Sequence, residues 1–476
     1  MAEQHNDINR PVNPRRRKKT KFQIFKEAYL PVVIIGLALV LIVVFIVGSV
    51  KRSLANKRAD EASSLAASSS LADIQAQLEK EAQELIKEAE LLAADYDYQG
   101  AIAVLNTFRG DISKFTNIND KILAYEAAIR NLVAWVDPGE VVNLSFQLLI
   151  ADTARSFSDA TYGSAFNRNF ITTEEFSKIL HQLYENGYIL VDLDDIISVE
   201  TKEDGTTAYK AKTLYLPNGK KPLMLTQTNV NYNYYLIDSD GDRLPDAGGC
   251  GFASKLLWDG SKFTCEMVDA TGQTVTGAFD MVPILENFIA EHPDFSYRGA
   301  KATLALTGYN GLLGYRTHYS ASNTFGETAF QQDIKDVTTV INALRENGYT
   351  IACYTYENVA YGQYSATQIK ADLDSWTKDV VPILGDVNIL AYAQNSDITT
   401  DALYSGEKYE ALQQQGFRYY LGFCKDGKPW ATVTDDYVRQ GRILVTGSNL
   451  AHHADWFASL FDPDTVLDTT RGNIPQ

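Results

Sequence analysis

The sequence predicts an α/β domain built around a parallel β-sheet over residues 136–476. Short apolar runs typical of buried strands alternate with stretches whose apolar residues recur at helical spacing. A helix followed by Asn-Gly and then by a strand occurs twice, in YENGYILVDL and in RENGYTIACYT. Polar clusters follow several of these strands, which is where barrel enzymes keep their chemistry. Repeated units of this kind predict a parallel sheet, either open or closed.

The strands and helices can be placed in order along this domain. The first long helix spans 171–187, where Thr172 and Glu175 have the spacing of a capping box. Two more helices are expected, over 278–293 and 330–348. The expected strands are VVNLSFQLLI (141–150), YILVDL (188–193), KPLMLT (221–226), KATLALT (301–307), YTIACYT (349–355), DVNILAYA (386–393), FRYYLGFC (417–424) and GRILVTGS (441–448).

The segment before this domain predicts a membrane anchor. Residues 28–50 carry no charge, and as a helix they would span about 34 Å, enough to cross the hydrocarbon core. Residues 1–27 carry a net charge of +5 and the rest of the chain −22. The more basic flank stays inside the cell, so we expect a cytoplasmic tail (1–27), a single-pass helix (28–50) and an extracellular C-terminal part. A cleaved signal peptide is the alternative.

Between the anchor and the α/β domain the sequence predicts helices. Residues 51–75 are rich in Ala, Ser and charge and form a stalk, and residues 76–135 form a helical hairpin. Within it, DYQGAIAVL resembles part of a tetratricopeptide repeat. One repeat and a half cannot build a solenoid, so the module is either a spacer or a docking site for a partner.

Charge and cysteine content limit the function classes. The acidic bulk excludes nucleic acid as an expected partner. An extracellular location permits disulfides, and Cys250 and Cys265 flank a predicted hairpin, which makes a local bridge plausible. Cys353 and Cys424 are equally well read as buried thiols. The chain has no CxxC motif, so a zinc knuckle is not supported.

The order of these segments resembles the polysaccharide deacetylases, the NodB-homology family. The resemblance rests on TTEEFSKILHQLYENGYILVDLDDI, PLMLTQTNVNY, HPDFSYRGAKATLALTGYNGLLGYRT and LRENGYTIACYTYENVAYG, and it covers most of 140–476. More closely, the chain resembles membrane-anchored Gram-positive members with a helical stalk. The resemblance implies a distorted (β/α) barrel of the TIM type with about seven strands.

The resemblance also implies a chemistry that this sequence does not reproduce. Family members remove acetyl groups from N-acetylated sugars with a divalent metal, held by an aspartate and two histidines, beside an aspartate base. The positions that match the aspartate pair are Thr228 and Asn229, and those that match the histidines are Tyr354 and Asn358. A phenol with a pKa near 10 and a neutral amide are poor zinc ligands, and none of the four is a base. Gln147 stands where related sequences tend to have histidine.

The remaining histidines offer little compensation. His5 lies in the predicted cytoplasmic tail, His181 and His292 in helices, and His452 and His453 near the C-terminus, where they loosely match the family's last motif. His318 follows a strand and is the one expected pocket member. Glu357 and Asp397 would face the same cleft in a site for a harder cation.

We therefore expect a catalytically degenerate, cell-wall-facing domain that holds a glycan such as peptidoglycan, with no catalytic metal. Amides pair with hydroxyls and aromatic rings cover the apolar faces of sugars. The expected lining residues are Asn229, Asn231, Arg316, His318, Tyr354, Tyr356 and Asn358. Two alternatives remain: an active N-deacetylase with an altered Zn²⁺ or other divalent-metal site, and an interaction scaffold that works through the stalk.

A separate signal is the acidic loop DSDGDRLPD (238–246). Its carboxylates, Asp238, Asp240, Asp242 and Asp246, alternate around a glycine, as in short calcium loops of extracellular repeats. The alternative is a solvated acidic turn. A bound Ca²⁺ would be structural.

Overall fold

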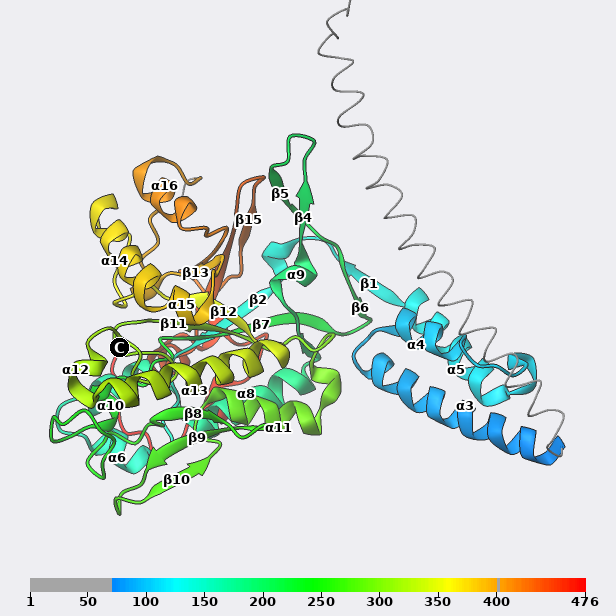
Figure 1. Ribbon diagram of the computed structural model, residues 1–476, viewed down its shortest axis with the longest axis horizontal. Helices are drawn as coiled ribbons and strands as arrows, with labels where there is room; N and C mark the ends of the chain where they lie inside the picture. The colour runs from blue at the N-terminus through cyan, green and yellow to red at the C-terminus, as the bar shows by residue number, and fades with distance from the viewer. Residues whose placement is uncertain (1–70, 400–402) are drawn as a thin grey trace, which may run out of the picture. The chain divides into compact units, whose positions relative to one another are not determined.

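The computed structural model describes residues 71–399 and 403–476 (Figure 1). The chain divides into two compact units, Met1–Gln83 and Glu84–Gln476, and the elements after α3 belong to the second. The predicted cytoplasmic tail, the predicted membrane helix at 28–50 and most of the stalk lie outside the described residues. Among the helices that are described, none is long and apolar enough to cross a bilayer.

The region predicted to be a helical hairpin contains α3 (Leu71–Ala94), α4 (Tyr98–Leu105), η1 (Ile112–Lys114) and α5 (Thr116–Arg130). The Asp97 carboxylate caps α4 by accepting a hydrogen bond from the backbone N–H of Gly100. The prediction was wrong at the C-terminal end of the module, because Leu132–Trp135 forms strand β1. This strand pairs antiparallel with β6 (Leu214–Pro217), which suits its β-branched and aromatic residues.

Within the described part of the chain, seven parallel strands close into a barrel. The strand pattern of the sequence was compatible with an open or a closed sheet, and the structure shows the closed form. Strand β11 pairs with β12 and also with β7, and this second pairing completes the ring. The strands are β2 (Val142–Phe146), β7 (Lys221–Thr228), β11 (Ala302–Leu306), β12 (Thr350–Cys353), β13 (Ile389–Ala391), β14 (Tyr419–Phe423) and β16 (Val438–Leu444). Strand β3 (Tyr188–Leu190) pairs with the first residues of β7, outside the ring.

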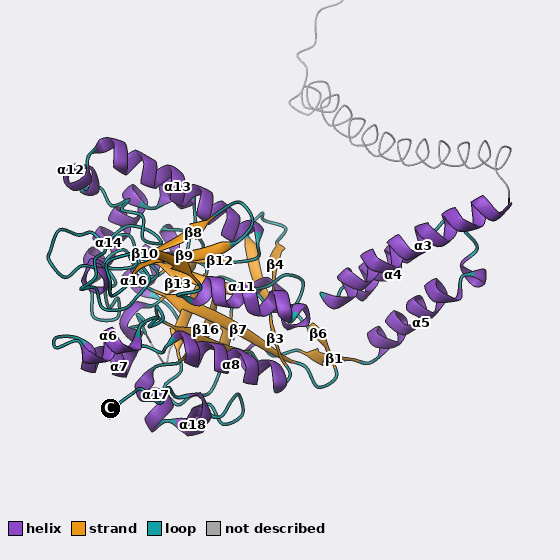
Figure 2. Ribbon diagram, turned by 90° about the horizontal axis from the view of Figure 1, so that it is seen from below, coloured by secondary structure: helices purple, strands orange, loops and turns teal. Residues whose placement is uncertain are grey.

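Helices pack on the outside of the strands (Figure 2). The main ones are α8 (Thr173–Glu185), α11 (Met281–Glu291), α13 (Glu327–Glu346), α14 (Ala366–Asp379) and α16 (Gly406–Gln414). Along each strand, side chains point alternately outward to these helices and inward to the barrel interior. The outward set, which includes Leu144, Leu225 and Leu304, joins the larger hydrophobic core. The inward set includes a polar layer, in which Asn143 bonds both Thr226 and Gln440.

The remaining elements are short and lie in the connections. They are η2 (Pro138–Glu140), α6 (Thr153–Ser158), α7 (Gly163–Asn169), α9 (Leu193–Ile196), β4 (Ile197–Thr201), β5 (Thr207–Ala211), α10 (Tyr234–Ile237), β8 (Lys255–Trp258), β9 (Phe263–Val268), β10 (Thr274–Gly277), η3 (Pro293–Phe295), α12 (Ala321–Phe325), α15 (Val381–Leu384), η4 (Ala393–Asn395), β15 (Ala431–Val433), α17 (Gly447–His452), η5 (Ala454–Trp456) and α18 (Pro463–Val466).

The expected hairpin between Cys250 and Cys265 is present as β8 and β9, but the disulfide is not, and that prediction was wrong. All four cysteines are free and buried. The Cys250 Sγ lies 3.4 Å from the carbonyl oxygen of Tyr235, whereas the Cys265 Sγ lies 3.8 Å from the Tyr232 hydroxyl. The two thiols therefore pack against different parts of the core.

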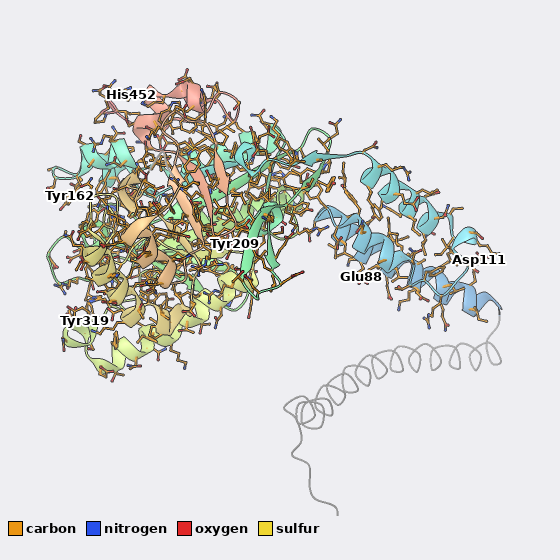
Figure 3. The ribbon with its side chains drawn as sticks, turned by 90° about the horizontal axis from the view of Figure 1, so that it is seen from above. Glu88, Asp111, Tyr162, Tyr209, Tyr319 and His452 are labelled. Atoms are coloured by element: carbon orange, nitrogen blue, oxygen red, sulfur yellow. The ribbon has the colours of Figure 1, made fainter. Side chains whose placement is uncertain are left out.

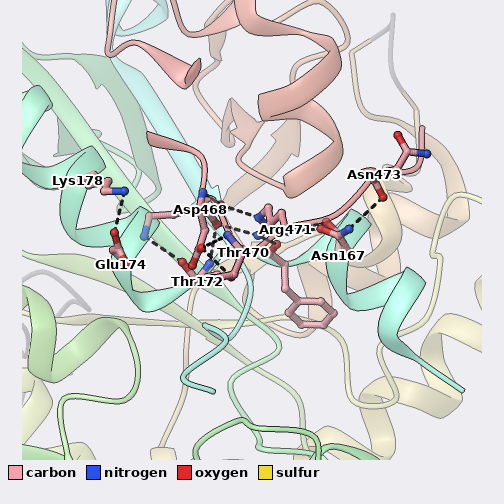
Figure 4. Close-up of polar contacts among 10 residues, drawn as sticks. Asn167, Thr172, Glu174, Lys178, Asp468, Thr470, Arg471 and Asn473 are labelled. Carbon is pink, nitrogen blue, oxygen red and sulfur yellow. Dashed lines mark hydrogen bonds and ion pairs between the residues drawn. The ribbon is translucent and has the colours of Figure 1, made fainter. Parts of the chain in front are cut away.

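A buried ion pair fastens the C-terminal segment to the barrel (Figure 4). The Arg471 guanidinium contacts both carboxylate oxygens of Glu175, at 2.6 and 2.7 Å, and the backbone carbonyl oxygens of Asn167 and Phe170. Glu175 also accepts the backbone N–H of Thr172, which confirms the predicted capping box of α8. The start of α8 and the end of the chain thus share one buried carboxylate.

Candidate functional site

The four positions predicted to match a metal and base site lie at one end of the barrel. Thr228 ends β7 and Tyr354 follows β12, and both strands flank β11. The Thr228 hydroxyl donates to the carbonyl oxygen of Phe146, at the end of β2, at 3.1 Å. The backbone N–H of Tyr354 donates to Leu306, the last residue of β11, at 2.7 Å. The carboxyl ends of these parallel strands form the barrel mouth.

The loop after β7 carries amide side chains with unmet hydrogen-bonding capacity. Asn229 has a left-handed backbone conformation, with φ of 59°, and its side-chain oxygen accepts from the Thr307 hydroxyl at 3.2 Å. Thr307 accepts in turn from the Asn231 side-chain amide at 2.7 Å. The side-chain oxygens of Asn231 and Asn233 are buried without a hydrogen-bond partner. Buried acceptors of this kind are costly unless a water or a ligand donates to them.

Tyr309 faces these amides from the end of β11. Burial raises the pKa of the Tyr309 phenol, and the Asn231 and Asn233 amides oppose that rise, so the three side chains lie close together. Because the amide oxygens have no hydrogen-bond partner, a donor such as a water or a sugar hydroxyl has an acceptor here.

The loop after β12 is fixed in place by two carboxylates of α14. Asp372 accepts the backbone N–H groups of Tyr356 and Glu357 and, at 2.6 Å, the Tyr361 hydroxyl. Asp379 accepts the Tyr356 hydroxyl at 2.6 Å. Tyr356 was predicted to line a pocket, but it is buried and its hydroxyl is already bonded. Neither aspartate was singled out from the sequence, because both sit in an ordinary helical pattern.

Asn358 remains partly accessible in this loop. It has a left-handed backbone conformation, with φ of 55°, and its carbonyl oxygen accepts from the Gln394 side chain at 2.6 Å. Its side chain, like that of Asn229, is only half-buried. These two amides are the predicted lining residues that stay most open to a ligand.

Arg316 and His318 have structural partners in the loop after β11. The Arg316 guanidinium donates to the carbonyl oxygens of Asn310 and Tyr232, at 3.0 and 2.9 Å, and lies over the Tyr234 ring. His318 is hydrogen-bonded to the Tyr234 hydroxyl at 3.2 Å and to Ser320 at 2.9 Å. Burial and the charge of Arg316 lower the pKa of His318, which keeps the imidazole neutral at neutral pH. Both residues hold the loop rather than line an open pocket.

Arg442 is the main site residue that sequence reasoning missed. It lies on β16 with its guanidinium fully buried, donating to the carbonyl oxygens of Gly422 and Tyr392 at 2.9 and 2.8 Å. A third contact, at 3.4 Å, reaches the Ser145 hydroxyl at the end of β2. The Tyr354 ring centroid lies 5.9 Å from its Cζ atom. Burial lowers its pKa, but an arginine remains charged at neutral pH.

No aspartate or glutamate of the described residues pairs with Arg442. A full positive charge therefore sits at the barrel mouth beside Tyr354 without an acidic partner among the described residues. Within the sequence GRILVTGS, this arginine gave no signal, because its partners lie up to 297 residues away.

The residues at the mouth do not fit a catalytic divalent metal. The donors at the four positions are a hydroxyl, two amides and a phenol, without the charge or the imidazole nitrogens that hold zinc. The buried guanidinium adds like-charge repulsion, which is strong in a region of low dielectric. The donor set and the resident cation both disfavour a dication.

Exposed tyrosines lie in the segments that follow three of the barrel strands. Tyr162 lies after β2, Tyr235 in α10 after β7, and Tyr319 after β11, and all three are exposed. The rings of Tyr162 and Tyr235 are 5.4 Å apart. In Figure 3, Tyr162 and Tyr319 lie at the left-hand side of the molecule, whereas Tyr209, which packs against Tyr419 at the start of β14, lies farther right. We call Tyr162, Tyr235 and Tyr319 the tyrosine rim.

The histidines and carboxylates that might have formed a relocated metal site are used elsewhere. His452 bonds the carbonyl oxygen of Ile474, and the rings of His181 and His292 lie 6.0 Å apart, edge to face. Asp397 is buried against Arg439 at 2.9 Å and accepts the Tyr404 hydroxyl, while Glu357 is exposed. The expectation that Asp397 and Glu357 face one cation site has no support in these contacts.

Residues 71–399 and 403–476 contain one group of three or more His, Cys, Asp or Glu side chains that could hold an ion. It is formed by Asp238, Asp240 and Asp246, whose ligand atoms lie within 4.8 Å of one another. Asp242 is not part of this group, and its Oδ1 accepts the backbone N–H of Leu244. The loop therefore gathers three of the four carboxylates that the sequence suggested.

Comparisons with known proteins found similarity in structure alone. No family model and no curated protein matches the sequence. The chain is similar to the Streptococcus pyogenes deacetylase PplD in complex with acetate, covering 70% of this chain and 98% of that one at 11% identity and a TM-score of 0.32. It is also similar to a de-N-acetylase from Aggregatibacter actinomycetemcomitans, covering 64% and 95%, at 11% identity and a TM-score of 0.24.

Proposed function

We propose that this protein is a membrane-anchored, extracellular glycan-binding protein whose deacetylase-like barrel has lost hydrolytic chemistry. One observation carries the proposal: uncharged side chains occupy all four positions of the metal and base, and the buried Arg442 guanidinium lies beside one of them. Without a bound dication or a carboxylate base at these positions, nothing there activates water for attack on an acetamide.

The same mouth has groups that suit a sugar. Asn229 and Asn358 offer amides that are partly accessible, and the buried oxygens of Asn231 and Asn233 lack donors. The tyrosine rim offers exposed aromatic faces on which the apolar face of a pyranose ring can lie. The proposed ligand is therefore a hydroxyl-rich cell-wall glycan such as peptidoglycan, held without covalent change.

The membrane anchor in this proposal is supported by the sequence. The uncharged run at 28–50 and the basic tail before it favour a single-pass helix with the barrel outside the cell. An anchored barrel on a stalk would hold glycan close to the membrane.

The acidic loop supports a separate proposal of a structural Ca²⁺. Asp238, Asp240 and Asp246 already bring carboxylate oxygens together on the loop after α10, and carboxylates are the ligands that calcium prefers. Such an ion would order the loop and takes no part in the proposed glycan binding.

The test uses full-length protein purified in detergent. We expect it to sediment with insoluble peptidoglycan and to release no acetate from peptidoglycan or chitooligosaccharide, with or without added Zn²⁺, Co²⁺ or Mn²⁺. The triple variant Tyr162→Ala/Tyr235→Ala/Tyr319→Ala should lose most of the sedimentation. Release of acetate that a chelator abolishes would contradict the proposal, and so would unchanged sedimentation of the rim variant.

A further inference from the structure

A cavity of about 410 Å³ lies at the other end of the barrel strands. Its walls come from five separate stretches of the second unit. The lining residues are Tyr96, Tyr98, Gln99, Ile129, Leu132, Asp195, Lys212, Thr213, Leu214, Tyr215, Tyr297 and Arg298. Leu214 and Tyr215 precede β7, and Tyr297 and Arg298 precede β11, whereas the mouth residues follow these strands. Because the strands are parallel, the cavity and the mouth lie at opposite ends of the barrel.

Four tyrosines form the aromatic walls of this cavity. The rings of Tyr96 and Tyr297 are stacked, with centroids 6.1 Å apart and planes at 22°. Tyr98 meets Tyr96 edge to face at 6.4 Å, and it is only half-buried. Tyr215 is 52% exposed on β6. The buried pair supports the Tyr98 ring, and Tyr215 adds a second accessible ring to the cavity lining.

The charged groups around the cavity are of both signs, with Lys212 and Arg298 on one side of the balance and Asp195 and Asp97 on the other. The Lys212 ammonium donates to the carbonyl oxygen of Asp194 at 2.6 Å, and Arg298 pairs with Asp97 at 3.6 Å. Burial raises the pKa of the Asp195 carboxyl, and Lys212 and Arg298 oppose that rise. Because these two cations and two carboxylates carry no net charge, the cavity suits a neutral ligand that forms hydrogen bonds.

Two of the lining residues have a backbone conformation that L-residues rarely adopt. Tyr96 has φ of 64° and Arg298 has φ of 52°. The Tyr96 hydroxyl donates to the carbonyl oxygen of Asp294 at 2.5 Å, and the backbone N–H of Arg298 donates to Asp95 at 3.1 Å. Such strain costs about 1–3 kcal/mol per residue and is often found at binding sites. Here it positions Tyr96 and Arg298 on the cavity.

We infer that this cavity is a second glycan-binding site, which takes one or two neutral pyranose units. Its volume lies in the range of small-ligand pockets, and accessible aromatic faces beside hydrogen-bonding groups match the two surfaces of a sugar. The site shares no residue with the mouth, so it stands or falls independently of the proposed function. Sites at opposite ends of one barrel would let a single molecule contact two glycan segments, which increases avidity.

The experiment is photo-crosslinking of the full-length protein with a diazirine derivative of N-acetylchitotetraose, a neutral oligosaccharide, followed by peptide mass spectrometry. We expect labelled peptides that contain residues 96–99, 213–215 or 297–298, in competition with the unlabelled sugar. Tyr98→Ala/Tyr215→Ala should reduce this labelling about tenfold. Val133→Ala, an exposed position on the neighbouring strand β1, is the matched control and should leave the labelling unchanged.

Two results would overturn the inference. One is that these peptides are not labelled above background even at a high concentration of the diazirine sugar, or that their labelling is unchanged in Tyr98→Ala/Tyr215→Ala. The other is stronger labelling of the same peptides by a diazirine-bearing tetrapeptide, which would mean that the cavity takes a peptide. Unchanged thermal melting of the double variant and of Val133→Ala checks that lost labelling is not lost folding. Labelling of the mouth loops is scored separately and reports on the proposed function alone.

Discussion

Arg442 determines the electrostatics of the barrel mouth. A buried charge is normally paired with an opposite one, because desolvation of an unpaired ion is expensive. The carbonyl oxygens of Gly422 and Tyr392 compensate part of that cost. A divalent metal bound at the same end of the barrel would be repelled by this guanidinium.

This leads to a prediction for restored metal ligands. The variant Thr228→Asp/Asn229→Asp/Tyr354→His/Asn358→His supplies the missing donor types, but Arg442 remains in place. We expect it to bind Zn²⁺ at least tenfold more weakly than the same variant with Arg442→Met, measured by competition with a chromophoric chelator. Equal affinities would show that the guanidinium does not repel the ion.

Asp280 gives a second prediction at this scale. The buried carboxyl accepts hydrogen bonds from the Leu149 N–H, Gln227 and Tyr232. Burial raises its pKa to about 6 from the ordinary 3.8. The folded state therefore binds more protons between pH 4 and 6, and stability falls as the pH rises through this window. At 1.36 kcal/mol per pKa unit, the loss is about 3 kcal/mol.

Asp280→Asn lacks this titration. Between pH 4 and pH 7, wild type should lose about 3 kcal/mol of unfolding free energy more than the variant does, measured by urea denaturation at each pH. Other buried carboxyls, such as Asp192 with its pKa raised to about 7, are common to both proteins and cancel in the difference. Parallel stability curves would contradict the assignment to Asp280.

At the scale of elements, the sequence predicted the barrel strands and the positions of its loops. The short apolar runs and the Asn-Gly helix ends are local signals, and the seven barrel strands and β3 follow them. It did not predict β1, because Leu132–Trp135 continues a helical pattern until β6 pairs with it. It also mistook Arg316 for a lining residue, since only the folded loop brings the carbonyl oxygens of Tyr232 and Asn310 to the guanidinium.

The Glu175–Arg471 pair connects two elements, α8 and the C-terminal segment (Figure 4). Arg471→Met would leave the buried Glu175 carboxylate without its partner, so we expect a loss of about 3–5 kcal/mol in unfolding free energy. Lys178→Met removes the exposed ion pair with Glu174 on the same helix and should change stability by less than about 1 kcal/mol. Denaturant titrations of the three proteins decide this, and similar losses in both variants would refute the role of the buried pair.

In the acidic loop after α10, Asp240 belongs to the candidate Ca²⁺ site and Asp242 does not, and this difference can be tested. If Ca²⁺ binds at Asp238, Asp240 and Asp246, then 1 mM Ca²⁺ should protect the loop from proteolysis in wild type. Asp240→Asn should abolish the protection, whereas Asp242→Asn, which alters a carboxylate outside the group, should retain it. Equal protection with and without the ion would mean a solvated acidic turn.

At the scale of the whole molecule, the chain combines a predicted anchor with a closed barrel, and the buried Arg442 at the barrel mouth has no acidic partner among the described residues. The proposed glycan contacts lie at both ends of that barrel, and each has aromatic rings at its edge. The acidic net charge of the chain beyond residue 27 neither attracts nor repels a neutral glycan, whereas it repels nucleic acid. Anchoring and glycan retention are thus consistent with one role at the cell surface.

The most direct test of the account is a Co²⁺ titration of full-length wild-type protein, followed by the visible absorption of ligated cobalt and by metal analysis after gel filtration. We predict no saturable absorption from a site at the mouth and no retained metal that depends on Tyr354 and Asn358. One equivalent of tightly held cobalt, lost on Tyr354→Phe/Asn358→Ala, would contradict the account.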